Sequence, residues 1–218
     1  MWKVWLRPFV RPLPQWSPIA VASPQRVVTA TLHGDGGSTD ATADHTVASL
    51  KPLTIATGFD AGQRAVLDSR DRATGTLLGI LRLKRTGPVA RAGVSVAFYH
   101  VVTGEHHCLG WPQRPWNTWL QNHAIQKTRS SHHSLMEPDA VQQLMIAYLC
   151  PRPVVLVSVA APGHPNIFPM DLIGPLERSG FFSLALRSTN VSVPVMREVR
   201  RVALSGMPAT MKDVVYKL

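Results

Sequence analysis

Prolines and glycines interrupt this chain along its whole length, because 218 residues include 18 prolines and 15 glycines. Both residue types break regular elements, so their spread predicts many short segments joined by turns. This favours a β-rich architecture over a helical bundle. Apolar residues make up 45% of the chain, the usual share for a globular protein. A chain of this length can bury an ample core in one large domain or two small ones.

The hydrophobic pattern of residues 1–110 also indicates strands. Apolar residues there alternate or run continuously, and they do not follow the 3.6-residue period of a helix. We expect a strand in "RVVTATLHGDGG" that ends in a turn at Asp35 and Gly36, and two more at 46–50 and 53–57. Further strands are expected in "AVLDSR", "LLGILRLKR" and "AGVSVAFYHVV". The region predicts a β-meander or a small barrel.

One segment after this region reads as a helix, "MEPDAVQQLMIAYLC". Pro138 suits its first turn, and Asp139 suits the positive end of the helix dipole. Its expected apolar face consists of Val141, Leu144, Met145 and Tyr148. A linker is expected at 130–134. We therefore divide the chain into a β-rich region of unassigned role at 1–130 and a second region at 131–218.

The second region continues with short alternating elements. Strands are expected at 154–159, in "NIFPMDLIGP" with proline breaks, at 181–187 and in "RRVALSG". A turn in "APGH" separates the first two. The segment "VSVPVMREV" predicts a helix capped by Thr189 or Asn190, and a last helix is expected to start at Pro208.

An internal repeat is indicated by a gap-free alignment. Placing Val27 on Val154 matches "VVTATLHGDGGSTDATAD" with "VVLVSVAAPGHPNIFPMD", with four identities in eighteen positions. The strand, glycine turn and strand also coincide. Two related half-barrels explain this match, and two ordinary hairpins explain it nearly as well.

The overall charge is strongly basic, with a formal net charge of +10 and an isoelectric point near 10.4. Such a balance admits nucleic acid, an anionic membrane face or a phosphorylated cofactor as partners. The basic residues are mostly single arginines, such as Arg64, Arg70 and Arg82, and no nucleic-acid-binding motif accompanies them. A solvated surface explains this scatter better than a nucleic-acid footprint does.

The sequence contains few features that would indicate a compartment or a membrane. Two cysteines, Cys108 and Cys150, favour a reduced intracellular chain over a disulfide framework. The start "MWKVWLRPFV" lacks the core of a signal peptide, and no apolar run has the length of a membrane span. We expect a cytoplasmic protein. The Trp- and Pro-rich residues 1–25 suit a lid, an arm or a leader.

The segment "LALRSTNVSV" carries the best candidate for binding chemistry. Arg187 ends a strand, and Ser188, Thr189 and Asn190 then open a helix. Free N–H groups, hydroxyls and a guanidinium together suit an anion, of which phosphate is the natural example. From this motif alone, a plain helix cap with a surface arginine is the simpler explanation.

The segment "GHPNIFPMDLIGP" adds a second candidate. Three prolines and Asp171 are unusual in an apolar ribbon, which an edge strand with irregular turns would explain. Alternatively, the breaks free backbone N–H and C=O groups for a planar heterocycle with amide edges. Such a site beside a phosphate pocket would describe a flavin mononucleotide (FMN) site.

These two motifs together resemble the flavin reductase-like domain, the FMN-binding split-barrel family. The similarity covers about residues 137–218, through "PRPVVLVSVAAPGHPNIFPMDLIGP" and "FFSLALRSTNVSV". The resemblance implies a split β-barrel of Greek-key type in which the Asn-x-x-Pro segment passes the flavin ring. The resemblance implies that the flavin ring is contacted by Asn166, Pro169, Met170, Asp171, Leu172 and Ile173. It implies that the FMN phosphate is bound by Arg187, Ser188, Thr189 and Asn190.

Two departures from the family pattern stand out. Many members carry Ser or Thr at the position of Asp171, and an ionised carboxylate cannot donate a hydrogen bond to a phosphate. A complete domain of the family also continues well beyond the position of Leu218. Either further strands follow, or the N-terminal β-region supplies them.

Other candidates for chemistry carry weaker signals. His106, His107 and Cys108 are adjacent, so a strand would point them to opposite faces, and His132 and His133 share this defect. Unligated surface histidines are the simpler explanation, and we expect no metal site. The tryptophans at 111–119, with Arg114, suit stacking on a ring but more often form a core or subunit interface. Nucleophile elbows, phosphate-binding loops and dinucleotide glycine motifs are absent from the sequence.

The leading hypothesis is an FMN-binding oxidoreductase in which reduced nicotinamide, NAD(P)H, delivers hydride to the flavin. The family resemblance also implies a homodimer with the flavin near the subunit interface. The cofactor carries this chemistry, so no protein acid or base is required and we name no catalytic residue. The alternatives are an FMN-binding protein without turnover and a basic β-domain that binds polyanions.

Overall fold

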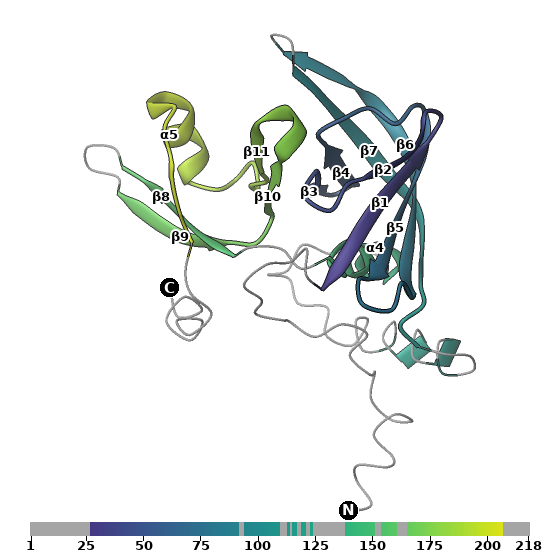
Figure 1. Ribbon diagram of the computed structural model, residues 1–218. Coiled ribbons are helices and arrows are strands. Elements are labelled where there is room, and N and C mark those ends of the chain that lie inside the picture. The colour runs from purple at the N-terminus through teal and green to yellow at the C-terminus, as the bar shows by residue number, and fades with distance from the viewer. Residues whose placement is uncertain are drawn as a thin grey trace, which may run out of the picture.

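The computed structural model describes residues 27–91, 94–109, 138–150, 154–160 and 165–206, and it also describes 113, 115, 116, 119, 120 and 123. The protein is mainly β, with antiparallel sheets, as expected (Figure 1). The Trp-rich start, the linker at 130–134, the "APGH" turn and the helix expected from Pro208 lie outside the described residues. Among the described helices, none is long and apolar enough to cross a membrane.

Seven strands form the first sheet, in the order β2-β1-β5-β6-β7-β4-β3. They are β1 (Val28–Gly34), β2 (Gly37–Asp40), β3 (His45–Leu50), β4 (Leu53–Thr57), β5 (Arg64–Asp71), β6 (Leu77–Arg91) and β7 (Val94–His106). Every neighbouring pair is antiparallel. All the strands expected in this region are therefore confirmed, and β2 is an additional one.

The first sheet curves around a single core. Alternate residues of β1 point inward, so Val28, Ala30 and Leu32 are buried. Side chains from β3 to β7 join the same cluster, including the fully buried Tyr99. The two edge strands, β2 and β3, are connected by only four residues, 41–44. This arrangement is a small, partly open barrel, in agreement with one of the two forms expected.

Helix α4 (Pro138–Ala147) packs against this core, beside the sheet in Figure 1. Its existence and its acidic first turn were predicted correctly. The predicted apolar face was only partly right, because the most buried residues are Ile146 and Ala147. Leu144 and Tyr148 from the predicted face flank them against the core. The helix lies on the N-terminal sheet although the sequence groups it with the region at 131–218.

The second part of the chain contains two small sheets and one helix. Strands β8 (Val155–Val159), β9 (Asn166–Met170) and β12 (Ala203–Gly206) form one sheet in the order β12-β8-β9. Strands β10 (Ile173–Leu176) and β11 (Phe181–Leu184) form a hairpin around the 3-10 turn η2 (Glu177–Ser179). Helix α5 (Ser192–Val199) follows. The expected strand at 181–187 is shorter than predicted, and "NIFPMDLIGP" is split into β9 and β10.

The second part has a core of its own, formed by Val155, Val157, Val159 and Ile173. Alternation along β8 places its three valines on one face, as in β1. Side chains of α5, among them Val195 and Val199, cover this cluster. The two cores are therefore distinct: the first combines the seven-stranded sheet with α4, and the second lies within β8–β12 and α5.

The two halves repeat the same strand arrangement with the same register. The alignment of Val27 with Val154 places the pair Thr31–Asp40 of β1/β2 on the pair Ser158–Ile167 of β8/β9. It also places the pair Ser49–Thr54 of β3/β4 on the pair Leu176–Phe181 of β10/β11. Two unrelated hairpins would share neither register nor order, so the structure supports related units. We call β1–β5 unit 1 and β8–β12 unit 2.

The fifth strand of each unit also corresponds. Both β5 and β12 pair antiparallel with the central strand, and Asp68 opposite Thr31 corresponds to Ala203 opposite Ser158. Asp68 follows Thr54 by 14 residues and Ala203 follows Phe181 by 22, and this difference equals the eight residues of α5. Unit 2 is thus the unit 1 pattern with α5 inserted before its fifth strand.

Strand pairing does not connect the two units within the described residues. No strand of the seven-stranded sheet joins β8–β12, so the N-terminal strands do not complete the second barrel by pairing. The units meet instead where β10 lies against β3. There, Glu177 donates its backbone N–H to the Ala43 carbonyl at 3.3 Å.

Candidate functional site

The segment expected to pass a flavin ring forms the edge strand β9 and the bend that follows it. Because β9 is last in the order β12-β8-β9, its outer backbone edge pairs with no strand among the described residues. Pro169 sits opposite Leu156 inside the regular ladder with β8. A proline on an edge strand fits the simpler explanation of this segment, and it also leaves an open edge for a ligand.

The residues assigned to the ring differ in their surroundings. Asn166 is half-buried, whereas Asp171 is exposed between β9 and β10. Ile173 is fully buried in the second core, and Met170 packs against that core. Leu172 packs against the first core. Asn166, Pro169 and Asp171 are therefore better placed to meet a ligand than Met170, Leu172 and Ile173.

The segment expected to bind a phosphate forms a turn before α5. Asn190 closes this turn by donating its N–H to the Arg187 carbonyl at 2.9 Å. Arg187, Ser188 and Thr189 are exposed, and their side chains form no hydrogen bond or ion pair with other described residues. The turn thus presents one guanidinium and two hydroxyls to solvent at the start of a helix.

Ser192 connects the two segments. It is buried, and its N–H donates to the Asn190 side-chain oxygen at 2.8 Å. Its hydroxyl accepts a hydrogen bond from the Asn166 side-chain amide at 2.7 Å. The N-cap is Val191 and not the predicted Thr189 or Asn190, although the Asn190 side chain still accepts one N–H of the first helical turn. Sequence reasoning missed Ser192, and its place in the first helical turn was the available signal.

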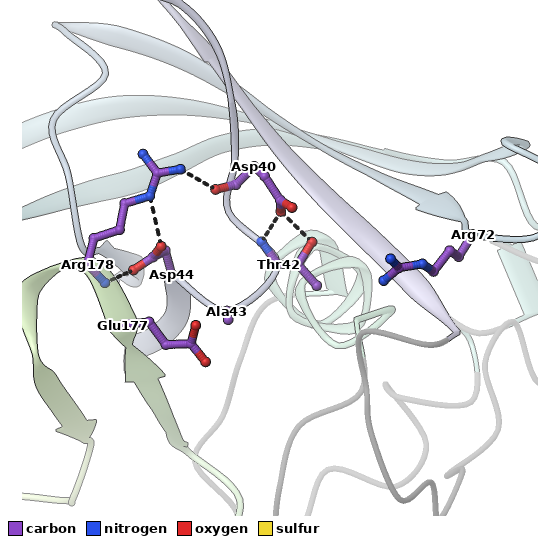
Figure 2. Close-up of a pocket in the computed structure, with 7 residues that line it drawn as sticks. All are labelled: Asp40, Thr42, Ala43, Asp44, Arg72, Glu177 and Arg178. Carbon is purple, nitrogen blue, oxygen red and sulfur yellow. Dashed lines mark hydrogen bonds and ion pairs between the residues drawn. The ribbon is translucent and has the colours of Figure 1, made fainter.

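A polar cavity of about 470 Å³ lies where the two units meet. Figure 2 shows its lining, which consists of Asp40, Thr42, Ala43, Asp44, Arg72, Glu177 and Arg178. The buried Asp44 carboxylate accepts the backbone N–H of Arg178 at 2.7 Å and pairs with its guanidinium at 3.1 Å. Asp40 accepts hydrogen bonds from the hydroxyl and N–H of Thr42, and the hydroxyl bond is the main cause that lowers the pKa of Asp40.

Two of the three acidic side chains in this cavity already have partners within the protein. Because these carboxylates bind other residues of the protein, we interpret the cavity as a contact region between the units and not as a ligand-binding site. Sequence reasoning did not identify it, because Asp44 and Arg178 are far apart in the chain.

The histidine and tryptophan clusters contain no metal site in the part of the chain that the structure describes. The expectation of surface histidines was wrong for His106, which is 1% exposed because it lies on the inner face of β7. The Cys108 thiol donates to the Leu78 carbonyl at 3.4 Å, and burial raises its pKa. Trp116 and Trp119 stack at 5.1 Å between ring centroids and are half-exposed. Arg114, His132 and His133 lie outside the described residues.

Comparison with known proteins adds few assignments. No protein-family model matches the sequence, and no curated protein matches it. Among solved structures, the NADH:FAD oxidoreductase SgcE6 of Streptomyces globisporus C-1027 overlaps 38% of this chain and 76% of its own, at 13% identity and a TM-score of 0.28. BorF, the flavin reductase component of a bacterial two-component tryptophan halogenase, overlaps 37% and 79%, at 14% identity and a TM-score of 0.28. Similarity at this level assigns no family to the chain.

Proposed function

We propose that unit 2 binds FMN and that the protein is a flavin-dependent oxidoreductase using NAD(P)H. The observation that carries the proposal is the pair of hydrogen bonds through Ser192. Through Ser192, these bonds connect Asn166, in the segment expected to pass the flavin ring, with Asn190, in the segment expected to bind the phosphate. The sequence suggested these two segments separately. A plain helix cap would require only one of these bonds.

The residues of the turn have the chemistry that a phosphate requires. Arg187 supplies a guanidinium, Ser188 and Thr189 supply hydroxyls, and the first turn of α5 supplies positive dipole character. On β9, the open backbone edge offers N–H and C=O groups to the amide edge of a flavin ring. When bound, FMN supplies the hydride-accepting chemistry, and these residues hold and orient it.

Asp171 is the residue that fits this assignment least well. It is exposed, so water can solvate its carboxylate without any contact to a phosphate. We assign it no role in holding the phosphate. The ring segment then consists mainly of Asn166 and the β9 edge around Pro169.

The test compares binding of FMN and of riboflavin, which lacks the phosphate. Both ligands are titrated by flavin fluorescence into the wild type, the double variant Ser188→Ala/Thr189→Ala, and Arg187→Gln. Because hydrogen bonds to a charged group contribute about 1.5–3 kcal/mol, each change should weaken FMN binding by about tenfold or more. Riboflavin affinity should stay unchanged. The matched control is Thr103→Ala, which removes an exposed hydroxyl on β7 in the first sheet.

Unchanged FMN affinity in the turn variants would contradict the phosphate assignment. Absence of flavin binding by the wild type would contradict the whole proposal and favour the polyanion-binding alternative. Anaerobic addition of NAD(P)H to the FMN complex separates the remaining two functions. Bleaching of the flavin absorbance is expected for a reductase, and a stable oxidised spectrum would indicate binding without turnover.

A further inference from the structure

The outer face of the first sheet brings separate basic residues together. Arg64 of β5 lies directly opposite Lys84 of β6, and Lys84 lies directly opposite His100 of β7, on three neighbouring strands (Figure 1). Directly opposite residues of a sheet share a face, and neighbouring strands are about 4.8 Å apart. All three side chains are exposed. They therefore form one row across β5, β6 and β7.

The inward neighbours of these residues confirm which face they occupy. Ala65, Leu83 and Tyr99 are one residue away on each strand, and all three are buried in the first core. Arg82, two residues before Lys84 on β6, is exposed on the same outer face. In the sequence these basic residues are separate, and antiparallel pairing assembles them. We call Arg64, Arg82 and Lys84 the outer basic cluster.

The outer basic cluster lacks matching carboxylates. Arg64 and Lys84 make no hydrogen bond or ion pair with other described residues. Arg82 is 3.9 Å from Glu105, and both of these side chains are more than half exposed, so the pair contributes little. Like charges directly opposite each other destabilise a sheet. The pair of Arg64 and Lys84 therefore departs from ordinary sheet composition, as residues that bind a partner often do.

Acidic residues of this outer face lie to one side of the cluster. Asp68, Ile80 and Glu105 form another row across the same three strands. This row is four residues along β5 from Arg64, which is about 13 Å. The Asp68 carboxylate is buried and pairs with Arg70 at 2.9 Å. An extended anionic ligand would therefore lie across the strands, over the cluster, and not along them toward the carboxylates.

We propose that the outer basic cluster binds the phosphodiester backbone of a nucleic acid. Phosphates repeat about every 3.4 Å along each strand of a duplex, and long side chains on strands about 4.8 Å apart can match this spacing. The net charge of +10 adds attraction at longer range. Contacts to phosphates do not read base sequence, so this binding is independent of sequence. The site lies on the first sheet and does not depend on flavin binding by unit 2.

An anionic membrane surface suits the cluster less well. Peripheral binding to a bilayer combines basic residues with apolar side chains that enter it. Among the residues of β1–β7 whose side chains the structure describes, Val102 is the one large apolar residue that is exposed. A single valine buries little apolar area. The cluster therefore offers charge without a surface that would insert into lipid.

Fluorescence anisotropy with a short, fluorescein-labelled DNA duplex tests the proposal on the full chain without added flavin. The wild type should bind, with an association constant that falls as the NaCl concentration rises from about 50 to 200 mM. Arg64→Gln and Lys84→Gln should each reduce the slope of log K against log [NaCl] by about 0.9. At about 0.1 M NaCl each should weaken binding by about eightfold, the factor that this slope gives relative to 1 M salt.

The matched control is Arg197→Gln/Arg201→Gln, which removes two charges from exposed positions in the second part of the chain. It should keep the wild-type slope, whereas Arg64→Gln/Lys84→Gln should reduce the slope by about 1.8. Urea unfolding checks that the cluster variants are folded. Their midpoints should be no lower than that of the wild type, because each variant removes a like-charge pair.

Three results would overturn the proposal. The first is a wild type that does not bind the duplex. The second is an equal loss of binding in the control, which would mean that net charge alone attracts the DNA. The third is binding to vesicles of phosphatidylcholine and phosphatidylserine, but not to the duplex, that Arg64→Gln/Lys84→Gln abolishes. That result would assign the outer basic cluster to a membrane surface.

Discussion

At the residue scale, Asp44 makes the most direct polar connection between the two units. Its carboxylate is buried, and it binds both the backbone N–H and the guanidinium of Arg178. A buried carboxylate that loses its charge leaves these donors poorly satisfied. Since half of the Arg178 side chain is exposed, solvent screens part of the effect.

We therefore expect Asp44→Asn to lower the free energy of unfolding by about 1–2 kcal/mol, measured by urea denaturation. The matched control is Asp171→Asn, since the repeat gives these aspartates equivalent positions and Asp171 is exposed. The control should leave stability unchanged. Equal losses in both variants would mean that the contact with Arg178 contributes nothing specific.

Tyr99 gives a prediction about pH. Its hydroxyl donates to Asp60 at 3.1 Å and accepts the N–H of Ala61 at 2.7 Å, and burial raises its pKa. The folded state therefore holds the phenol proton more tightly than the unfolded state does. Its contribution to stability is complete below the unfolded tyrosine pKa of about 10 and is lost as the pH rises through the folded value.

Unfolding experiments across this alkaline range should show a fall in stability for the wild type. Tyr99→Phe should be less stable at neutral pH, because it leaves the Ala61 N–H without its acceptor, and should show a smaller alkaline fall. The phenolate absorbance of the wild type should also develop later than that of free tyrosine. An identical alkaline fall in Tyr99→Phe would assign the pH dependence to other groups.

At the element scale, two glycines determine how closely α4 approaches the sheet. A Cβ at Gly79 of β6 would lie 2.6 Å from Leu149 and 2.8 Å from Ile146. A Cβ at Gly104 of β7 would meet Ile146 at 3.0 Å. The helix can contact the strands because both positions lack a side chain.

Gly79→Ala should therefore lower the free energy of unfolding by about 1–3 kcal/mol, as overpacking of a core does. Gly36→Ala is the control, because its Cβ would meet nothing within 4 Å and Gly36 has no positive φ. Thermal unfolding followed by circular dichroism compares the two. If Gly79→Ala were as stable as the control, α4 would have to shift on the sheet without cost.

Much of the element order could be predicted from the sequence, because strands with one buried face show a period of two. The strands up to β7 other than β2 were found in this way, whereas α4 and α5 were found from their proline, acidic and capping residues and the repeat from an alignment. The division of "NIFPMDLIGP" into β9 and β10 was missed, since Leu172 contacts the first core and Ile173 the second. The centre of the buried face of α4 was missed because it depends on Gly79 and Gly104, which lie far away in the sequence.

In the candidate site, too, contacts between residues far apart in the sequence could not be predicted. Each of its two motifs could be recognised locally, from prolines in a strand and from hydroxyls before a helix. Their connection through Ser192 depends on a contact between α5 and β9, which no local pattern predicts. The cavity at Asp44 and Arg178 likewise depends on how the units meet.

At the scale of the whole molecule, the two related units differ in the size of the sheets to which they belong. Unit 1 is part of a seven-stranded sheet with α4 against its core, whereas unit 2 divides into two small sheets with α5 added. They contact each other mainly where β10 lies against β3, and the most specific polar contact is that of Asp44 with Arg178. Such an arrangement predicts that the two cores open separately, because each side chain stabilises mainly its own cluster.

Hydrogen exchange of variants in each core tests this separation. Val157 and Leu32 are both fully buried, in the second and first core respectively. Val157→Ala should destabilise its core by about 1–3 kcal/mol, since it deletes two buried methyl groups, and should speed exchange in β8, β9 and β12. Protection in β1, β5 and β6 should stay as in the wild type. Leu32→Ala should do the reverse, with faster exchange in the first sheet and unchanged exchange in unit 2. If either variant speeds exchange equally in both sheets, the two units fold as one cooperative body, and the contact of Asp44 with Arg178 couples them more strongly than the exposure of the Arg178 side chain suggests.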